Sequence, residues 1–346
     1  MGSLNHTTVQ RTPMPRKKGY NMQDIMVSII CTAYNHEKYI RKCLDGFVMQ
    51  ETDFLYEVLV HDDASTDTTS SIIQEYEKLY PNIIKPIYQT ENQYSKGVSI
   101  TRNIIFPKCR GKYIAICEGD DYWTDPHKLH KQVKALETHP DCFMCVCKTE
   151  RVSEDESIII GYCPNFPLDE GVIESDEFMR IIFKEYAFHT SSYVFCAALY
   201  KKYAENTPDF VRVCPVGDEA YMLYFGQAGN VFYCKDTMTC NRRGSIGGWN
   251  ERTWSNKNNR NRYYLGMAET YKEFDIYTKG RYHELCSQKT YLEQYLASES
   301  ARDFQKLVFE KEHMFLKQPV RRKIRIITGA VCNPLLKLYY KAVQKK

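Results

Sequence analysis

Short apolar runs alternate with helical patterns over the first third of this 346-residue chain, and this alternation constrains the fold more than any other feature. Each apolar run is only a few residues long and is bounded by polar or turn-forming residues, which is typical of a buried strand. The predicted strands are 26–31, 56–63, 84–90 and 112–117, and the predicted helices between them are 40–48, 65–79 and 97–106. Such alternation predicts an α/β fold, with a Rossmann-like, mostly parallel sheet flanked by helices.

Polar clusters follow three of the predicted strands, at the point where each strand ends. They are TAYN (32–35), HDDAST (61–66) and EGDDYW (118–123). In open α/β sheets, ligands bind beyond the carboxyl ends of the strands. We therefore expect the three clusters to converge on one crevice.

The EGDDYW cluster carries the strongest chemical signal, because folding alone gives little reason to place Asp120 and Asp121 directly after a buried strand. Carboxylate oxygens suit Mg²⁺ or Mn²⁺, and one or two carboxylates together with a diphosphate complete a site for such a cation. The alternative is a turn with a helix cap ahead of Pro126.

The other polar clusters are weaker signals when taken singly. Asp62 or Asp63 could accept hydrogen bonds from a ribose or a base, whereas Ser65 is a plausible N-cap of the following helix. Tyr34 offers an aromatic ring for base stacking. In PVGDEAYML (215–223), Asp218 and Glu219 precede an apolar helical run, so either is a dipole partner of that helix or a general base.

The organisation of the rest of the chain is coarser. Residues 1–24 have no periodicity and predict a flexible extension. Long stretches such as Tyr263–Tyr277 and His283–Leu296 predict a helical C-terminal region. We therefore expect a catalytic domain over 25–250 and a helical region over 251–346 with a basic amphipathic tail, 317–346. That tail suits an anionic membrane surface, although packing on the catalytic domain is the alternative.

Composition narrows the class of protein. A formal net charge of +4 gives no reason to expect a nucleic-acid partner, and no run reaches the roughly 18 apolar residues that a spanning helix needs. The 14 cysteines are scattered among apolar residues, which predicts free thiols in a reducing cytosol. Cys142, Cys145 and Cys147 interleave with apolar residues, which favours a buried strand over a zinc site.

From Met26 to about Trp249, the chain resembles the family 2 glycosyltransferases, which are inverting enzymes of the GT-A fold. The matching elements, in the order of the family, are VSIICTAYNHEKYIRKCLDGFVMQ, EVLVHDDASTDTT, GKYIAICEGDDYWTDPHKL and VGDEAYML. The resemblance implies a role for each position. Thr32, Tyr34 and Asn35 would lie at the nucleotide, Asp63 would bind its base or ribose, Asp120 would lie near the ribose, Asp121 would be the metal ligand, and Asp218 would be the catalytic base, with Glu219 as the neighbouring alternative.

One segment departs from the family pattern. Many relatives have a tyrosine, arginine and histidine grouping where this chain has CNRRGSIGGW (240–249), which contains no histidine. Arg242 and Arg243 could instead bind the diphosphate by charge-assisted hydrogen bonds, and Gly244, Gly247 and Gly248 would let the loop close over the donor. The alternative is an exposed basic turn.

The resemblance implies transfer of a sugar from a nucleotide-diphosphate sugar, with a UDP-sugar expected, to an acceptor hydroxyl. It further implies a glycan or lipid-linked acceptor, Mn²⁺ or Mg²⁺ as cofactor, and a cytoplasmic enzyme that could lie at the inner membrane face. A nucleotidyltransferase should show a glycine-rich phosphate loop after the first strand, and TAYNHEKY contains none. A dinucleotide-dependent oxidoreductase is disfavoured by the absence of G-x-G-x-x-G there. A non-catalytic nucleotide-sugar-binding protein is disfavoured by the full carboxylate set, Asp63, Asp120, Asp121 and Asp218.

Overall fold

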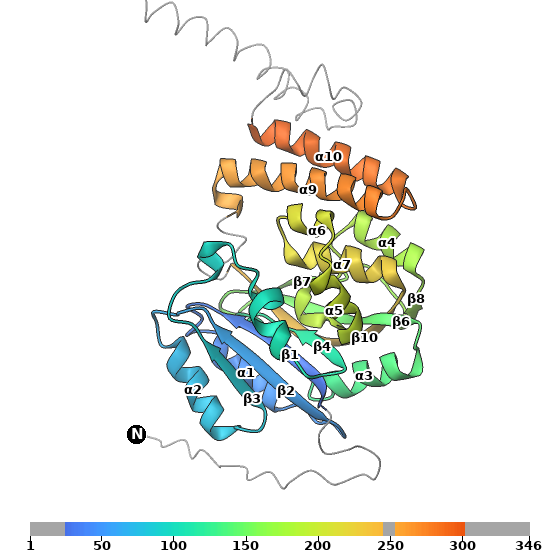
Figure 1. Cartoon of the computed structure of the whole chain (residues 1–346). Coiled ribbons are helices and arrows are strands. Elements are labelled where there is room, and N and C mark those ends of the chain that lie inside the picture. Colours follow the sequence, from blue (N-terminus) through green and yellow to red (C-terminus); the bar gives the residue numbers. More distant parts are fainter. Residues whose placement is uncertain (1–24, 245–252, 302–346) are drawn as a thin grey trace, which may run out of the picture.

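The structure is a computed structural model that describes residues 25–244 and 253–301 (Figure 1). The strands are β1 (Ile25–Ala33), β2 (Leu55–Asp62), β3 (Ile84–Tyr88), β4 (Tyr113–Ile116), β5 (Tyr122–Trp123), β6 (Cys142–Ser153), β7 (Ile159–Cys163), β8 (Gly171–Ile173), β9 (Val194–Cys196) and β10 (Asn230–Arg243). The helices are α1 (Ile40–Val48), α2 (Thr69–Leu79), α3 (Lys128–Thr138), α4 (Ser175–Lys184), α5 (Ala197–Glu205), α6 (Asp209–Val213), α7 (Gly217–Ala228), α9 (Lys257–Tyr277) and α10 (His283–Ala301).

The described strands form one sheet in the order β3-β2-β1-β4-β9-β6-β10-β5, with β7 on β6 and β8 on β10. Pairing is parallel from β3 to β4 and again between β6 and β10. The short strands β5, β7, β8 and β9 pair antiparallel with their neighbours. The predicted α/β architecture is confirmed; its parallel part is the half where strands alternate with helices, and the half with short connections is mixed.

Helices cover both faces of this sheet (Figure 1). Because successive side chains of a strand point to opposite faces, Ile29 of β1 packs with α1, α2 and α3, whereas Ile30 packs in the core formed with α4 and α7. Burial on both faces explains why β1 and β2 are nearly continuous apolar runs. The Cys142–Cys147 run begins β6, the buried strand that was predicted, and the described cysteines are all free thiols.

Two local predictions were wrong. The helix predicted from Ser65 begins at Thr69, because the Ser65 hydroxyl accepts a hydrogen bond from the backbone of Asn35 instead of capping the helix. The predicted third helix is a π-helical turn, Ile100–Ile105, followed by a 3₁₀ turn. Pro107 has no N–H to donate, so a regular helix does not continue through this segment.

The predicted helical C-terminal region is confirmed by α9 and α10, which lie side by side (Figure 1). Asn256 caps α9 by accepting hydrogen bonds from the backbone N–H groups of Asn258 and Asn259. Tyr271 and Phe274 of α9 belong to the same hydrophobic core as α7. The two helices therefore pack on the α/β part; residues 1–24, Gly247, Gly248 and the basic tail lie outside the described residues.

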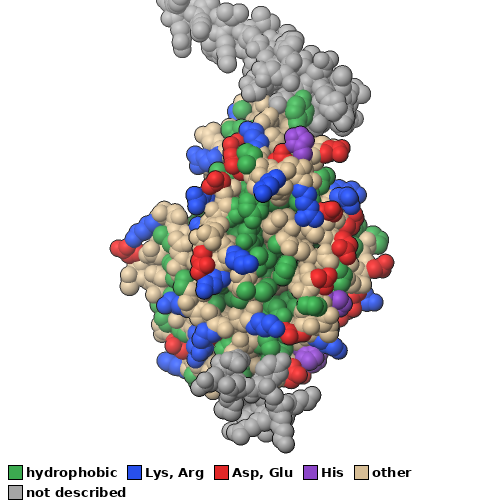
Figure 2. Space-filling view, turned by 45° about the vertical axis from the view of Figure 1, so that its right-hand side comes forward, with side chains coloured by type: hydrophobic (Ala, Val, Ile, Leu, Met, Phe, Trp, Pro, Cys, Tyr) green, Lys and Arg blue, Asp and Glu red, His purple; other side chains and the backbone are tan. Residues whose placement is uncertain are grey.

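The surface carries charges of both signs. On the face in Figure 2, a band of hydrophobic side chains runs down the middle, with Lys and Arg side chains interspersed with Asp and Glu on both sides of it. Among the described helices, none combines the length and the apolar character that a membrane span requires.

Candidate functional site

The loops after β1 and β2 are tied together by side-chain hydrogen bonds. The Asn35 backbone N–H donates to Ser65 Oγ (2.9 Å), and the Thr66 backbone N–H donates to Asn35 Oδ1 (2.8 Å). Asn35 has a φ of 55°, a left-handed conformation that asparagine tolerates better than most residues. Asn35 was predicted to lie at the nucleotide, and the structure shows that its side chain holds the two loops beside each other.

Asp63 sits at the end of β2 with 4% of its surface exposed. Its two carboxylate oxygens accept hydrogen bonds from the backbone N–H groups of Gln93 (2.8 Å) and Tyr94 (3.0 Å). Asp63 thus fixes the loop after β3 at the same sheet edge. Thr32 is partly buried there, and Tyr34 is 44% exposed at the rim, where its ring is available for stacking.

The loop after β4 passes close to β1 at Gly119. A Cβ atom on this glycine would lie 2.9 Å from His36 Nδ1 and 3.1 Å from the Thr32 carbonyl oxygen, so a side chain would collide. The Gly119 N–H donates to that carbonyl (2.9 Å). Glycine therefore lets Glu118, Asp120 and Asp121 lie against the end of β1, as the sequence predicted.

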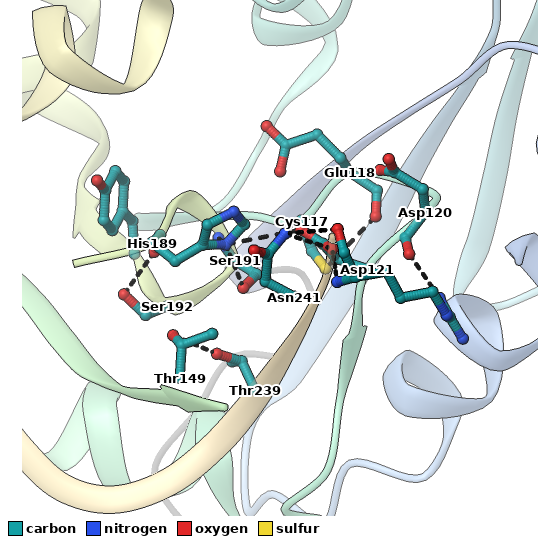
Figure 3. A network of polar contacts seen from close by, with 12 residues as sticks. Cys117, Glu118, Asp120, Asp121, Thr149, His189, Ser191, Ser192, Thr239 and Asn241 are labelled. Atoms are coloured by element: carbon teal, nitrogen blue, oxygen red, sulfur yellow. Dashed lines mark hydrogen bonds and ion pairs between the residues drawn. The ribbon is translucent and has the colours of Figure 1, made fainter. Parts of the chain in front are cut away.

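Asp121 points toward β10 (Figure 3). Its Oδ1 accepts hydrogen bonds from Asn241 Nδ2 and from the Arg242 backbone N–H, both at 3.0 Å, and its side chain is 3% exposed. Burial, together with the negative charges of Asp120 and Glu118, raises the pKa of Asp121 well above its usual value. Half of this carboxylate is thus committed to joining the β4 loop to the sheet.

Glu118 differs from Asp121 in having a carboxylate oxygen that nothing in the described chain engages. Its Oε2 is buried and has no hydrogen-bond partner in the described chain. Burial and the charges of Asp120 and Asp218 raise the pKa of Glu118 to about 8. In Figure 3 the carboxylates of Glu118 and Asp120 extend away from the Asn241 side of the loop. The unpartnered Glu118 oxygen, with the negative charge of Asp120 acting on it, suits a cation.

Arg242 is buried and is bound by other residues of the protein. Its side chain is 2% exposed, with Nε and Nη2 donating to Glu156 Oε1 (2.9 and 2.6 Å) and Nη1 donating to the Asp120 carbonyl oxygen (2.5 Å). The guanidinium also lies over the rings of Tyr39 and Tyr122. The Arg242 guanidinium thus holds the Asp120 backbone, and its predicted contact with the diphosphate stays a prediction.

Arg243 faces the other side of β10, since adjacent side chains of a strand alternate. It is partly buried, and its pKa is lowered by burial and by the positive charge of Arg151 on β6. The nearby Tyr186 and Asp121 act in the opposite direction and raise the pKa of Arg243. Arg243 therefore lies on the side of the sheet that Asp121 occupies.

Asp218 lies in the first turn of α7, at the positive end of the helix. Its Oδ1 accepts a hydrogen bond from the Glu219 backbone N–H (2.8 Å). Burial raises the pKa of Asp218, and the hydrogen bond from the Glu219 backbone and the nearby Tyr186 side chain partly offset the rise. The charge of Asp218 acts on Glu118, so α7 brings this carboxylate to the end of β4.

Glu219 points elsewhere. Its Oε1 accepts a hydrogen bond from the Tyr271 hydroxyl of α9 (2.8 Å). Burial, and then the charge of Asp218, raise the pKa of Glu219 to about 7. Of the two carboxylates at the start of α7, Glu219 serves the contact with the C-terminal helices, which leaves Asp218 as the candidate base.

Glu293 of α10 should make the protein more stable in mild acid than in mild base. It is 8% exposed, its Oε2 has no partner in the described chain, and burial raises its pKa to about 7. Stability linked to this proton is present below pH 4.5 and is lost as the pH rises through 7. We expect Glu293→Gln to be more stable than the parent at pH 8 by about 2 kcal/mol and nearly equal at pH 4.5.

Thermal unfolding at the two pH values checks this expectation. Glu284→Gln is the matched control, because Glu284 lies exposed on the same helix and should change neither curve. If the stability of Glu293→Gln changed with pH as much as that of the parent, Glu293 would not titrate as the structure indicates.

Three residues of the site escaped the sequence reasoning, namely Arg151, Tyr186 and His189. His189 Nδ1 lies 2.9 Å from Ser191 Oγ and 3.6 Å from Asp121 Oδ2. Burial lowers the pKa of His189 to about 3, so the ring is neutral here. The sequence signal was slight: one histidine ahead of a run of small hydroxyl residues.

The model for glycosyl transferase family 2 matches residues 28–207, which is more than half of the chain. The protein therefore belongs to this family, as the sequence motifs predicted. An uncharacterized protein of Mycobacterium tuberculosis is 47% identical over 129 residues, which make up 37% of this chain and 36% of that protein. The chain thus matches about a third of the length of this curated relative.

Two solved structures share the fold. TarS residues 1–349 of S. aureus, in complex with UDP-GlcNAc, superposes with a TM-score of 0.56 at 18% identity, covering 88% of this chain and 79% of that one. The mannosyltransferase PcManGT of Pyrobaculum calidifontis, in complex with GDP-Man and Mn²⁺, gives a TM-score of 0.52 at 17% identity, covering 90% and 88%. These likenesses confirm the GT-A fold.

Proposed function

We propose that this protein transfers a sugar from a nucleotide-diphosphate sugar to an acceptor hydroxyl, with inversion at the anomeric carbon. The observation that carries the proposal is that Glu118, which follows β4, lies within electrostatic range of both Asp120 and Asp218, the latter at the start of α7. Membership of glycosyl transferase family 2 supports it. A UDP-sugar donor, a glycan or lipid-linked acceptor and a peripheral membrane contact through the tail stay predictions.

The nucleotide end of the donor would lie at the ends of β1 and β2. Tyr34 offers an exposed ring for the base, and Thr32 lies behind it. Asp63 keeps lone pairs beyond its two backbone hydrogen bonds, so it can still accept one from a base or ribose. Asn35 acts indirectly in this proposal, by holding the two loops that form this edge.

The carboxylates fit a divalent metal. The buried, unpartnered oxygen of Glu118 beside Asp120 is the arrangement that a cation would relieve. Among the described residues, no three His, Cys, Asp or Glu side chains form a metal-binding group. We assign Asp120 and Glu118 as ligands ahead of Asp121, whose Oδ1 is engaged by β10.

A bound Mn²⁺ or Mg²⁺ supplies positive charge that offsets the charge developing on the leaving nucleoside diphosphate. PcManGT binds Mn²⁺ together with its GDP-sugar, which supports the choice of cation. Asp218 accepts the proton of the acceptor hydroxyl as that oxygen attacks the anomeric carbon. A base whose pKa is raised by burial is better matched to this task than an ordinary aspartate, because it holds the proton more strongly.

Calorimetric titration with UDP, GDP and dTDP, each with and without Mn²⁺, tests the proposal. We expect one diphosphate to bind in the presence of Mn²⁺ and Asp120→Asn to weaken that binding at least about tenfold. Asp53→Asn, at an exposed position, is the control and should bind as the parent does. If the parent binds none of the three under either condition, the proposed function is refuted.

A further inference from the structure

Two arginines face the same side of the sheet on the neighbouring parallel strands β6 and β10. The register pairs Arg151 with Asn241 and Ser153 with Arg243. Because side chains two residues apart on a strand share a face, Arg151 and Arg243 lie diagonally across the strand pair, on the face from which Asn241 reaches Asp121. The backbone pairing therefore holds two positive charges close together.

This pair carries positive charge without a counterion from the protein. Both side chains are partly buried, and neither forms an ion pair with a carboxylate anywhere in the described residues. Arg151 Nε is buried and has no hydrogen-bond partner there either. The neighbouring Arg242 shows the contrast, because Glu156 and a backbone carbonyl satisfy it. Like charges that are desolvated and unpaired destabilise the fold unless an anion joins them.

The groups around the pair show where that anion would lie. The charges of Arg151 and Arg243 both act on His189, as does that of Asp120. Arg243 is also within electrostatic range of Asp121 and of Tyr186, and Tyr186 in turn acts on Asp218. The pair therefore borders the space between the β4 loop and the start of α7, where the reaction is proposed to occur.

We propose that Arg151 and Arg243 together bind phosphate oxygens of the donor diphosphate. This inference rests on the proposed function, and it adds a residue, Arg151, that no sequence motif indicated. Guanidinium groups bind phosphate through paired N–H donors, so two of them on adjacent strands form a rigid anion site. The donor is favoured over an acceptor phosphate because Arg243 lies within electrostatic range of Asp121, in the loop that also carries Glu118 and Asp120, and the diphosphate must lie near the carboxylates that share its cation.

Titration of Arg151→Gln and Arg243→Gln tests the assignment. The probes are the nucleoside diphosphate that the parent binds with Mn²⁺ and the corresponding nucleoside. Each variant should weaken diphosphate binding by about 10- to 100-fold and leave nucleoside binding unchanged. Arg180→Gln, at an exposed position on α4, should behave as the parent. Circular dichroism and melting temperature show whether each variant is folded.

Each other outcome overturns the assignment. Diphosphate affinity that is unchanged in both variants would show that the pair does not contact the donor. A folded variant that loses nucleoside and diphosphate binding equally would indicate a purely structural role. Titration of glycerol 3-phosphate into the Mn²⁺–diphosphate complex distinguishes an acceptor phosphate from the donor diphosphate. If the parent binds glycerol 3-phosphate and only the two arginine variants lose that binding, the pair contacts an acceptor phosphate instead. If the parent protein binds no nucleoside diphosphate in the first titration, the proposed function itself is refuted, and not only the assignment of the two arginines.

Discussion

Asp218→Asn should lower the rate constant of sugar transfer by about 10²- to 10⁴-fold, the usual contribution of a general base. Asparagine keeps the shape of the side chain, and its amide oxygen can still accept the hydrogen bond from the Glu219 backbone N–H. It cannot accept a proton at neutral pH, so only the chemical step should fail. Measuring turnover and diphosphate affinity on the same sample separates this loss from a loss of binding.

Glu219→Gln is the matched control for Asp218→Asn. Its side chain bonds to Tyr271 of α9, so the variant should keep most of the transfer rate. If Glu219→Gln were inactive while Asp218→Asn remained active, the base would be Glu219, the alternative that the sequence left open. A fully active Asp218→Asn variant would remove Asp218 from the mechanism.

The parallel half of the sheet was predictable because its signals are local. A short apolar run predicts a buried strand without any knowledge of its tertiary partners. The strands β1, β2 and β4 lie where such runs predicted them. The polar clusters after them share one sheet edge for a topological reason, since parallel strands end on the same side. Nothing beyond the order of elements was needed to infer that convergence.

The different positions of Arg242 and Arg243 could not be predicted from local sequence patterns. The sequence predicted a closing loop or an exposed turn at residues 240–249, and β10 continues to Arg243. In a loop, Arg242 and Arg243 could both turn toward the donor, but in a strand they must point to opposite faces. A longer predicted strand would have separated them, although Glu156, the partner of Arg242, lies 86 positions away in the sequence and could not have been named.

Asp121 and Ser65 were assigned roles by pattern, and each also bonds to a distant residue that the pattern did not indicate. Asn241 lies 120 residues from Asp121, and Asn35 lies 30 residues from Ser65. Hydrogen bonds of this kind depend on tertiary packing, which propensity and spacing do not encode. The same holds for Arg151 and His189, which stand in no polar motif and reach the site only because β6, β9 and β10 are neighbours.

Arg242→Met should destabilise the protein by about 3 kcal/mol or more, because removing one partner of a buried ion pair leaves the other without its counterion. Methionine preserves much of the apolar packing against Tyr39 and Tyr122. Glu156 keeps Lys42 as a partner, which places the expected loss at the lower end of the usual range. Urea unfolding of the parent and the variant measures the difference.

The surface pair between Arg281 and Asp176 supplies the comparison for Arg242→Met. Both of its side chains are about half exposed, so Arg281→Met should cost less than about 1 kcal/mol. Arg242→Met should also weaken diphosphate binding, since the Asp120 carbonyl loses its donor and the β4 loop loosens. The two effects must appear together if Arg242 acts through the protein. A variant as stable as the parent that nevertheless loses diphosphate binding would instead place this guanidinium on the donor, as the sequence motif first indicated.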